Sequence, residues 1–393
     1  MTFIEIPDDS LFGLANLPYG VFSPPDGDPR VGVRVGDTVV DLAAALGDEV
    51  FAEPSLNAFM RQGRSRWVAV RERVAGLVTG DVPAEVLHPV DGVRMHLPFE
   101  VADYVDYYAS EHHATNLGRI FRPDAAALMP NWKHLPVGYH GRAGTVLVSG
   151  SDIVRPNGQR KTPTEAAPTF GPSRRLDIEA ELGFVVGTGS PLGEPVRTSD
   201  FAERVFGAVL VNDWSARDIQ GWEAQPLGPY LGKSFATSVS AWVVPLLALE
   251  AARVPMPKQD PEVLPYLRET EDWGLDIEFA VEWNGHTVSR PPYREMYWSP
   301  AQMLAHMTVG GASSRTGDLY ASGTVSGPER DRRGAFIEMS WNGQEPLEVG
   351  GAQRTFLEDG DEVVLTATAP GTDGARIGFG EVRGRVLPAR PTA

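Results

Sequence analysis

The 393-residue chain contains no cysteine. This absence excludes a disulfide framework, a thiolate zinc site, an iron–sulfur cluster and a cysteine nucleophile, because each of them needs the sulfur of that side chain. Any metal ion bound by the side chains must therefore be held by oxygen or imidazole.

Positive charge is scarce as well. The chain has 35 Lys and Arg against 52 Asp and Glu, which gives a formal net charge of −17. A chain this acidic, without a local basic patch, repels the phosphates of nucleic acids and anionic lipid surfaces. We therefore expect no nucleic-acid partner and no membrane partner.

Long apolar runs are missing too. The most apolar stretch, residues 241–252, is interrupted by Pro245 and Glu250, whereas a membrane-spanning helix needs about 20 apolar residues. The first ten residues, MTFIEIPDDS, lack the basic segment and apolar core of a secretion signal. These features predict a cytoplasmic protein.

What is present indicates two domains, since one hydrophobic core rarely serves so long a chain. Residues 31–46 alternate as in a strand and continue into a short helical run, and residues 55–77 have helical spacing broken near Gly63. Residues 83–98 are rich in Pro and Gly and show little periodicity. We place the boundary there, between a small α+β domain over residues 1–96 and a larger one over residues 97–393.

The larger domain is predicted to be mainly β, because short strand-like runs alternate with Gly and Pro turns. The clearest of these runs are residues 175–187, 204–213, 275–285, 334–343, 361–369 and 375–387.

One predicted strand carries several carboxylates. Between residues 176 and 184, apolar positions alternate with Asp177, Glu179 and Glu181, so all three acids share one face of a strand. Neighbours on that face lie about 7 Å apart, which lets two carboxylates bind one cation. An acidic strand face is more often simply solvated, and the pattern alone leaves both interpretations open.

Asp213 closes the apolar run 205–212 and precedes Ser215, a candidate helix N-cap. An acid in this position either forms a turn or belongs to a site at the end of a buried strand. In the helix that would follow, Arg217 and Gln220 share a face, as an acceptor-binding pair or as an ordinary surface pair.

Residues 103–123, DYVDYYASEHHATNLGRIFRP, are dense in polar and aromatic groups. Ser110 is a plausible N-cap with His113 in the first helical turn, and Asp106 and Tyr108 share a face if the preceding chain is extended. The helix dipole opposes protonation of such a histidine, and a general base must be neutral. His112 is the obvious competitor, and His113 needs a partner to be convincing.

Two further charged residues, Lys233 and Glu338, each allow a structural and a functional interpretation. Lys233 in GPYLGKSFATS does not belong to a phosphate loop, because Leu227 stands where the first glycine is needed. It is either solvated or directed at an oxyanion. Glu338, on the predicted strand 334–343, is either a rim residue or the carboxylate that orients a base.

Taken together, these segments resemble the fumarylacetoacetase family. The resemblance is carried in order by DYVDYYASEHHATNLGRIFRP, PNWKHLPVGYHGRAG, RRLDIEAEL, VLVNDWSARDIQGWE, PLGPYLGKSFATSVSAWVVP, PKQDPEVLPYL, ASGTVSG and FLEDGDEVV. It implies a small SH3-like N-terminal barrel, a C-terminal mixed β-sandwich roll and a homodimer. The implied reaction is hydrolysis of a carbon–carbon bond of fumarylacetoacetate to fumarate and acetoacetate, in tyrosine and phenylalanine breakdown.

The resemblance also implies roles for individual residues. A divalent cation, Ca²⁺ or Mg²⁺, is expected on Asp106, Glu179, Glu181 and Asp213, with Lys233 and Thr237 near a second, Mg²⁺ position. His113 is expected to deprotonate water with Glu338 orienting its ring, and Arg217, Gln220 and Lys233 to stabilise the alkoxide. The substrate is expected to be gripped by Tyr108, Arg122, Tyr139, Gln220 and Thr324.

The chain departs from the family at Ala224, where some members carry a tyrosine that touches substrate. This departure bears on substrate preference, so hydrolysis or decarboxylation of another acylpyruvate or β-diketo acid is a second interpretation. A non-catalytic module with a structural cation site would explain the acids. It would not explain the accompanying His113, Lys233, Arg217 and Glu338.

Overall fold

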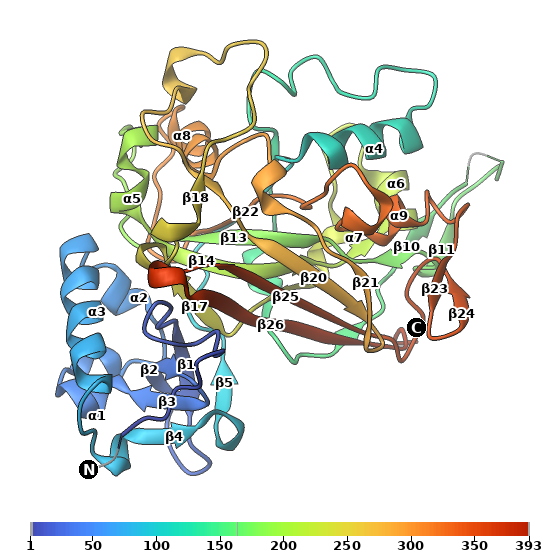
Figure 1. The fold of residues 1–393 in the computed structure, drawn as a ribbon. Coiled ribbons are helices and arrows are strands. Elements are labelled where there is room, and N and C mark those ends of the chain that lie inside the picture. Colours follow the sequence, from blue (N-terminus) through green and yellow to red (C-terminus); the bar gives the residue numbers. More distant parts are fainter. Residues whose placement is uncertain (1–2, 163, 392–393) are drawn as a thin grey trace.

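The computed structural model describes residues 3–162 and 164–391 of the chain. Strands dominate it, in a 13-stranded mixed sheet and a five-stranded sheet, with several two-stranded ladders (Figure 1). A small N-terminal part precedes a larger, sheet-rich part, as predicted. Within the described residues, no helix is both long enough and apolar enough to cross a membrane.

The N-terminal part folds from short strands and three helices. Its strands are β1 (Tyr19–Ser23), β2 (Arg30–Val35), β3 (Thr38–Asp41), β4 (Leu87–Pro89) and β5 (Arg94–His96), and its helices are α1 (Leu42–Leu46), α2 (Asn57–Met60) and α3 (Arg64–Val78). The predicted strand over residues 31–46 is a hairpin that turns at Gly36, where φ is +57°. The predicted helical break is confirmed at Gly63, which precedes α3 with φ of +87°.

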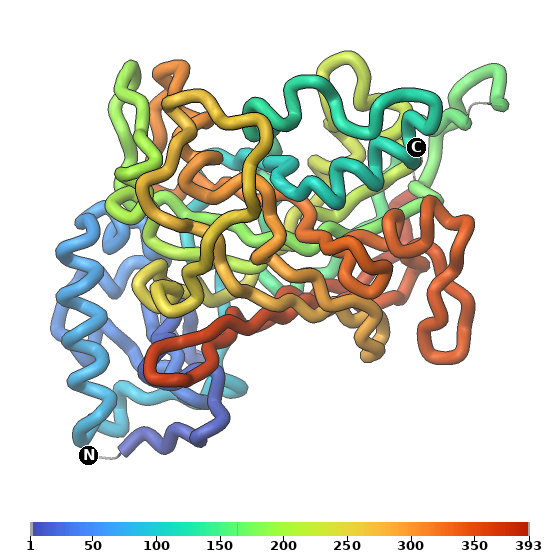
Figure 2. Tube along the Cα trace, turned by 45° about the horizontal axis from the view of Figure 1, so that its top comes forward, coloured from blue at the N-terminus to red at the C-terminus, as the bar shows by residue number. Residues whose placement is uncertain are grey.

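The N-terminal strands join the sheet of the larger part. β1 pairs with β17 (Trp242–Pro245) in the register Tyr19 to Val243. Residues 83–98 supply β4 and β5, so the Pro-rich stretch contributes strands to this sheet. Asn16 donates to the carbonyl of Gly378 at 2.7 Å, which ties the N-terminal part to a distant strand. Figure 2 shows the red C-terminal hairpin reaching the blue N-terminal segments.

The centre of the 13-stranded sheet is buried on both faces. Its strands run in the order β17, β14, β13, β22, β6 and β7, while β16 pairs with β14 and β8 pairs with β16. Their bounds are β6 (Tyr104–Tyr107), β7 (Gly138–His140), β8 (Val146–Val148), β13 (Ala180–Val186), β14 (Val205–Asp213), β16 (Thr237–Val239) and β22 (Leu319–Ala321). Every residue of β13 and β14 is buried, which explains the near-continuous apolar run of β14.

The second sheet completes the main core. Its order is β21 (His286–Ser289), β20 (Glu278–Trp283), β25 (Glu362–Pro370), β26 (Arg376–Leu387) and β9 (Ile153–Val154). The two sheets share one hydrophobic cluster, to which β13 contributes Phe184 and β20 contributes Trp283. The strands predicted at residues 204–213, 275–285, 361–369 and 375–387 are confirmed by β14, β20, β25 and β26.

Short helices gather at one end of β13 and β14 (Figure 1). These are α4 (Glu111–Phe121), α6 (Arg217–Glu223), α7 (Leu231–Ser234) and α9 (Phe336–Met339), while α5 (Phe201–Arg204) and α8 (Pro300–Thr308) lie elsewhere. The remaining ladders are β10 (Asn157–Arg160) with β11 (Thr169–Pro172), β12 (Leu176–Asp177) with β15 (Ser215–Ala216), β18 (Arg253–Val254) with β19 (Gly274–Leu275), and β23 (Leu347–Val349) with β24 (Ala352–Arg354).

Three local predictions are wrong. Residues 334–343 form the helix α9 and a turn, in which Trp341 and Asn342 have positive φ. The strand predicted over residues 175–187 is interrupted between β12 and β13, at residues 178 and 179. Ser215 is not an N-cap, since it lies in β15 and its hydroxyl donates to the carbonyl of Asp213 at 2.9 Å. The amides of Phe336 and Ile337 bind the distant Asp177, the Glu179 amide binds Asn212, and β15 pairs with β12, so contacts between distant segments override the local pattern.

Candidate active site

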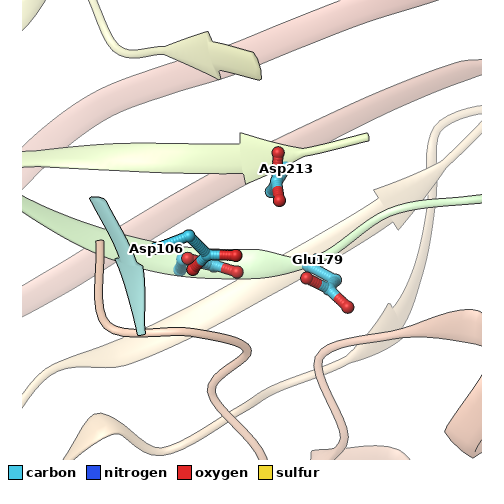
Figure 3. Close-up of side chains that lie close together, drawn as sticks. Asp106, Glu179 and Asp213 are labelled. Carbon is cyan, nitrogen blue, oxygen red and sulfur yellow. The ribbon is translucent and has the colours of Figure 1, made fainter. Parts of the chain in front are cut away.

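Four carboxylates converge at the end of the central strands. Asp106 lies on β6, Glu179 in the break between β12 and β13, Glu181 on β13, and Asp213 at the end of β14. One oxygen atom from each lies within 4.8 Å of the others, and all four residues are buried. Figure 3 shows Asp106, Glu179 and Asp213 turned toward a common point. Of the three acids that could have formed a solvated strand face, Glu179 and Glu181 are buried in this group, whereas Asp177 binds Arg217 instead.

Asp106, Glu179, Glu181 and Asp213 form what we call the carboxylate cluster. The surroundings of this cluster fit a divalent cation. Burial raises the pKa of Asp106 and of Glu181, and the neighbouring carboxylates raise it further. Within the described residues, Asp106 Oδ1 and Glu181 Oε1 have no hydrogen-bond partner. Buried carboxylate oxygens without a partner are costly, and an all-oxygen set of this kind suits Ca²⁺ or Mg²⁺. The cluster can therefore hold such an ion.

One lysine partly neutralises the carboxylate cluster. Lys233 Nζ, on α7, lies 3.1 Å from Asp213 Oδ2 and also donates to Glu179. Burial opposes its charge, yet Asp213 and Glu179 outweigh that effect and raise the pKa of Lys233, so it stays an ammonium. Asp213 further accepts from Thr237 Oγ1 at 2.8 Å and from Tyr139 at 3.3 Å.

Glu179 is the anionic centre of the site. Burial by itself would raise its pKa, but the charges of Lys233 and Arg217 outweigh burial and lower it. Glu179 is therefore ionised, in contrast to the raised pKa of Asp106 and Glu181. It joins the carboxylate cluster to the cationic side chains that line the cavity.

His113 has the partner that the sequence could not identify. The predicted cap is confirmed, because Ser110 Oγ accepts from the His113 amide at 3.2 Å at the start of α4. Nδ1 of His113 lies 2.7 Å from Glu338 Oε2. Glu338 also accepts from Asn116 at 2.9 Å and from Ser326 at 2.8 Å. Burial would raise the pKa of Glu338, but His113 and these hydrogen bonds outweigh it and lower the value.

An ionised Glu338 fixes the tautomer of His113. A carboxylate only accepts, so Nδ1 carries a proton, and in the neutral ring Nε2 is then the acceptor. Nε2 faces the carboxylate cluster, 3.8 Å from Glu179 Oε1. The neutral ring therefore directs its acceptor nitrogen at the cavity beside the cluster.

Arg217 and Gln220 share one side of α6, as predicted. Arg217 Nη1 donates to Gln220 at 3.2 Å and to Glu179 at 2.7 Å, while Nε donates to Asp177 at 2.8 Å. Its remaining nitrogen, Nη2, is buried and has no acceptor within the described residues. The two N–H groups of this nitrogen therefore have no acceptor of their own on a guanidinium that is otherwise held in place.

A cavity of about 730 Å³ lies over these groups. Most of the sequence-predicted residues line it: Asp106, Tyr108, His113, Arg122, Tyr139, Glu179, Arg217, Gln220, Lys233 and Thr324. Glu181, Asp213 and Thr237 lie at the cluster beneath, and Glu338 lies behind His113. His112 is outside the cavity, with Nε2 3.2 Å from Glu295.

Sequence reasoning missed Asn116 and Ser326, which hold Glu338. It placed Asp177 on one face with Glu179 and Glu181, whereas Asp177 binds Arg217 and the start of α9. Asn116 follows His113 by three residues on one helix, so helical spacing was a usable signal for it. Ser326 reaches Glu338, and Asp177 reaches α9, through contacts between distant segments, which the local sequence does not show.

Family models match both parts of the chain. Residues 103–387 match the family model described as Fumarylacetoacetate (FAA) hydrolase C-terminal, and residues 15–98 match that described as Fumarylacetoacetase N-terminal. The chain is 47% identical to fumarylacetoacetase of Homo sapiens over 418 residues, covering 99% of each chain. It is 43% identical to fumarylacetoacetase of Arabidopsis thaliana, again over 99% of each chain.

Solved structures share the fold. Fumarylacetoacetate hydrolase from Exiguobacterium antarcticum has a TM-score of 0.59 at 18% identity, covering 95% of this chain and 100% of that one. Maleylpyruvate hydrolase from Sphingobium sp. SYK-6 has a TM-score of 0.55 at 16% identity, with the same coverage. From the two family models and the full-length relatives, we conclude that this chain belongs to the fumarylacetoacetase family.

Proposed function

We propose that this protein hydrolyses fumarylacetoacetate to fumarate and acetoacetate. The observation that carries the proposal is the pairing of His113 with Glu338 at 2.7 Å, with the other imidazole nitrogen facing the carboxylate cluster. The full-length similarity to fumarylacetoacetases supports the choice of substrate. Water is the second substrate, and one carbon–carbon bond is broken.

In this proposal His113 activates water. Nε2 accepts a proton from water as its oxygen attacks the ketone carbon, and the resulting imidazolium is stabilised by the buried, ionised Glu338. The dyad needs no large rearrangement, since three hydrogen bonds already fix the carboxylate. The proton on Nε2 is then available to the departing carbon or oxygen of acetoacetate.

The tetrahedral alkoxide requires donors. Arg217 presents its unpartnered Nη2, and Gln220 and Lys233 line the same cavity. Each such donor is typically worth about 3 kcal/mol in the transition state. A divalent cation, Ca²⁺ or Mg²⁺, on Asp106, Glu179, Glu181 and Asp213 would supply Lewis-acid stabilisation of the enolate that leaves.

The remaining cavity residues are proposed to bind the substrate. Arg122 has a buried Nε without a partner in the described residues, and Thr324 has a buried hydroxyl in the same condition. Both line the cavity with Tyr108 and Tyr139. Free donors in these positions suit the carboxylates and ketone oxygens of a diketo diacid.

The test is a direct assay. Purified protein with Ca²⁺ or Mg²⁺ is expected to remove the ultraviolet absorbance of fumarylacetoacetate, and fumarate and acetoacetate should appear in equal amounts. Unchanged absorbance with either ion, in protein shown to be folded, would refute the proposal.

Ala224 favours a second candidate, hydrolysis or decarboxylation of another acylpyruvate or β-diketo acid. Ala224 lines the cavity and leaves it wider there than a tyrosine would. Comparing kcat/KM for fumarylacetoacetate with that for an acylpyruvate separates the two, because the better substrate must show the larger value.

We also propose that the protein is a homodimer in the cytoplasm and that its two domains meet near residue 97. A Mg²⁺ ion is proposed to bind near Lys233 and Thr237. Exposed apolar side chains near the cavity mouth support association: Leu227 is 95% exposed and Tyr230 is 67% exposed. Light scattering during gel filtration tests the dimer, and expression of residues 97–393 alone tests the boundary.

A further inference from the structure

Asp177 has an unusual number of hydrogen bonds for a residue outside the carboxylate cluster. Its side chain is fully buried. Oδ1 accepts from the amides of Ile178 at 2.8 Å and Phe336 at 2.7 Å. Oδ2 accepts from Arg217 Nε at 2.8 Å and from the amide of Ile337 at 3.0 Å. All four donors come from segments that border the site.

These contacts connect Arg217 to α9, and the two have different proposed roles in the reaction. Arg217 is the proposed alkoxide donor. Phe336 and Ile337 are the first two residues of α9, which carries Glu338, the partner of His113. The residue before α9, Ala335, has no side chain that can cap the helix. The carboxylate of Asp177, which lies on β12, caps α9 instead by accepting from its first two amides.

We infer that Asp177 is a positioning residue that sets the placement of Arg217 relative to the His113–Glu338 pair. Asp177 is not among the residues that line the cavity, and it is not one of the four acids of the carboxylate cluster. The inference rests on the proposed function, because it assigns Asp177 to the same reaction. A shift of about 1 Å in such a supporting contact is enough to cost about 100-fold in rate.

Replacing Asp177 by Asn keeps the shape of the side chain but replaces one of its two acceptor oxygens by a donor NH₂ group. Asn has one acceptor oxygen and one NH₂ group, so its nitrogen must face two of the four N–H donors. Either Arg217 and Ile337 or Ile178 and Phe336 then lose their acceptor. In either orientation at least one end of the link between Arg217 and α9 is broken.

Asp41 provides a matched control. It too is a buried aspartate that binds an arginine and caps a helix, accepting from Arg30 Nε at 2.5 Å and from the amide of Ala44 at 3.2 Å. It lies at the end of β3, in the N-terminal part. Asp41→Asn therefore reports the cost of disturbing such a group away from the cavity.

The experiment measures kcat, KM and thermal unfolding for wild type, Asp177→Asn and Asp41→Asn. We expect Asp177→Asn to lower kcat by about 100-fold with a much smaller change in KM, because the misplaced groups act in the transition state. Both variants should lose thermal stability, while Asp41→Asn keeps the wild-type kcat. Equal kcat in the two variants would overturn the inference.

A second readout does not depend on activity or on a bound ion. The proton between His113 Nδ1 and Glu338 gives a far-downfield ¹H resonance, assigned by its loss in Glu338→Gln. We expect this resonance to move or broaden in Asp177→Asn and to stay in place in Asp41→Asn. An unmoved resonance together with an unchanged kcat refutes the positioning role. An inactive wild type would refute the proposed function, but the resonance would still show whether Asp177 positions the His113–Glu338 pair.

Asp177→Ser guards against a variant that does not fold. Serine removes the charge without facing the backbone amides with an NH₂ group, and the same loss of kcat and shift of the resonance are expected. If neither variant folds while Asp41→Asn does, Asp177 serves the fold alone and the inference is wrong.

Discussion

Two adjacent histidines differ completely in their surroundings. His113 is 2% exposed and paired with Glu338, whereas His112 is partly exposed and faces Glu295. We expect His113→Ala to lower kcat by about 10²- to 10⁴-fold, the usual contribution of a general base, while substrate still binds. His112→Ala should keep most of the activity. Initial rates over a range of substrate concentrations test both. The opposite pattern would reverse the choice of base.

Glu269 is expected to make stability depend on pH away from the site. Its side chain accepts from Ser299 at 2.6 Å, and burial raises its pKa from 4.5 to about 7. A raised pKa means that the folded state binds the proton more tightly than the unfolded state. Burying the ionised Glu269 therefore lowers the free energy of unfolding by its full amount above pH 7, and this loss shrinks as the pH falls toward 4.5.

Glu269→Gln should accordingly raise the free energy of unfolding at pH 8, by about 1–3 kcal/mol after allowance for partial exposure, and change it little at pH 5. Urea unfolding at the two pH values measures this. Glu194→Gln, at an exposed position, removes the same charge and serves as the control. An equal gain at both pH values would contradict the prediction.

At the scale of elements, the first turn of α4 links stability to catalysis. Ser110 caps this helix at the His113 amide and also donates to the carbonyl of Ser326 at 3.3 Å. Ser110→Ala should lower the free energy of unfolding by about 1 kcal/mol and also lower kcat, because the cap holds His113 in place.

The control for Ser110→Ala is Ser299→Ala. Ser299 caps α8 through the amide of Gln302 at 3.1 Å, and α8 carries none of the proposed catalytic residues. A similar loss of stability with unchanged kcat is expected there. If Ser299→Ala lowers kcat as much as Ser110→Ala, the cap of α4 has no particular part in catalysis.

The sequence predicted those elements whose stability is local. The cap and helix at Ser110 and the buried run of β14 were readable because capping and apolar periodicity act within a few residues. Residues 334–343 were read as a strand because apolar side chains surround Glu338. They form α9 because the amides of Phe336 and Ile337 bind Asp177, which lies about 160 residues earlier in the chain.

The same distinction applies to the site. The acids could be identified as candidates from their places on strands, and the family resemblance brought His113, Glu338 and Arg217 together. Residue spacing alone could not show that Glu179 and Glu181 meet Asp106, because β13 and β6 are separated by β22 in the sheet. Nor could it show that Asp177 turns away from the other two acids to bind Arg217.

At the scale of the whole molecule, the carboxylate cluster sits where strands from distant parts of the sequence end together. The folded state therefore concentrates four buried acids, and the charge of Lys233 reaches two of them directly. Folding without a cation must overcome their repulsion, whereas a bound cation relieves it. Stability of the entire protein should therefore depend on the ion.

Removing divalent ions with a chelator is expected to lower the thermal unfolding temperature, and adding Ca²⁺ or Mg²⁺ should restore it. At an ion concentration of 100 times Kd, the gain is about 2.7 kcal/mol. Asp213→Ala should weaken ion binding and activity together. His113→Ala should keep the full response to the ion, because His113 is not one of the four acids of the carboxylate cluster.

Asp106→Asn separates repulsion from binding. The amide keeps the shape and removes a charge that burial and Asp213 already disfavour, so the ion-free variant should unfold at a higher temperature than ion-free wild type. The same change removes an anionic ligand, so added Ca²⁺ or Mg²⁺ should stabilise the variant less. Calorimetry of both proteins with each ion measures these effects. An equal response to the ion in wild type and Asp106→Asn would show that the ion binds elsewhere.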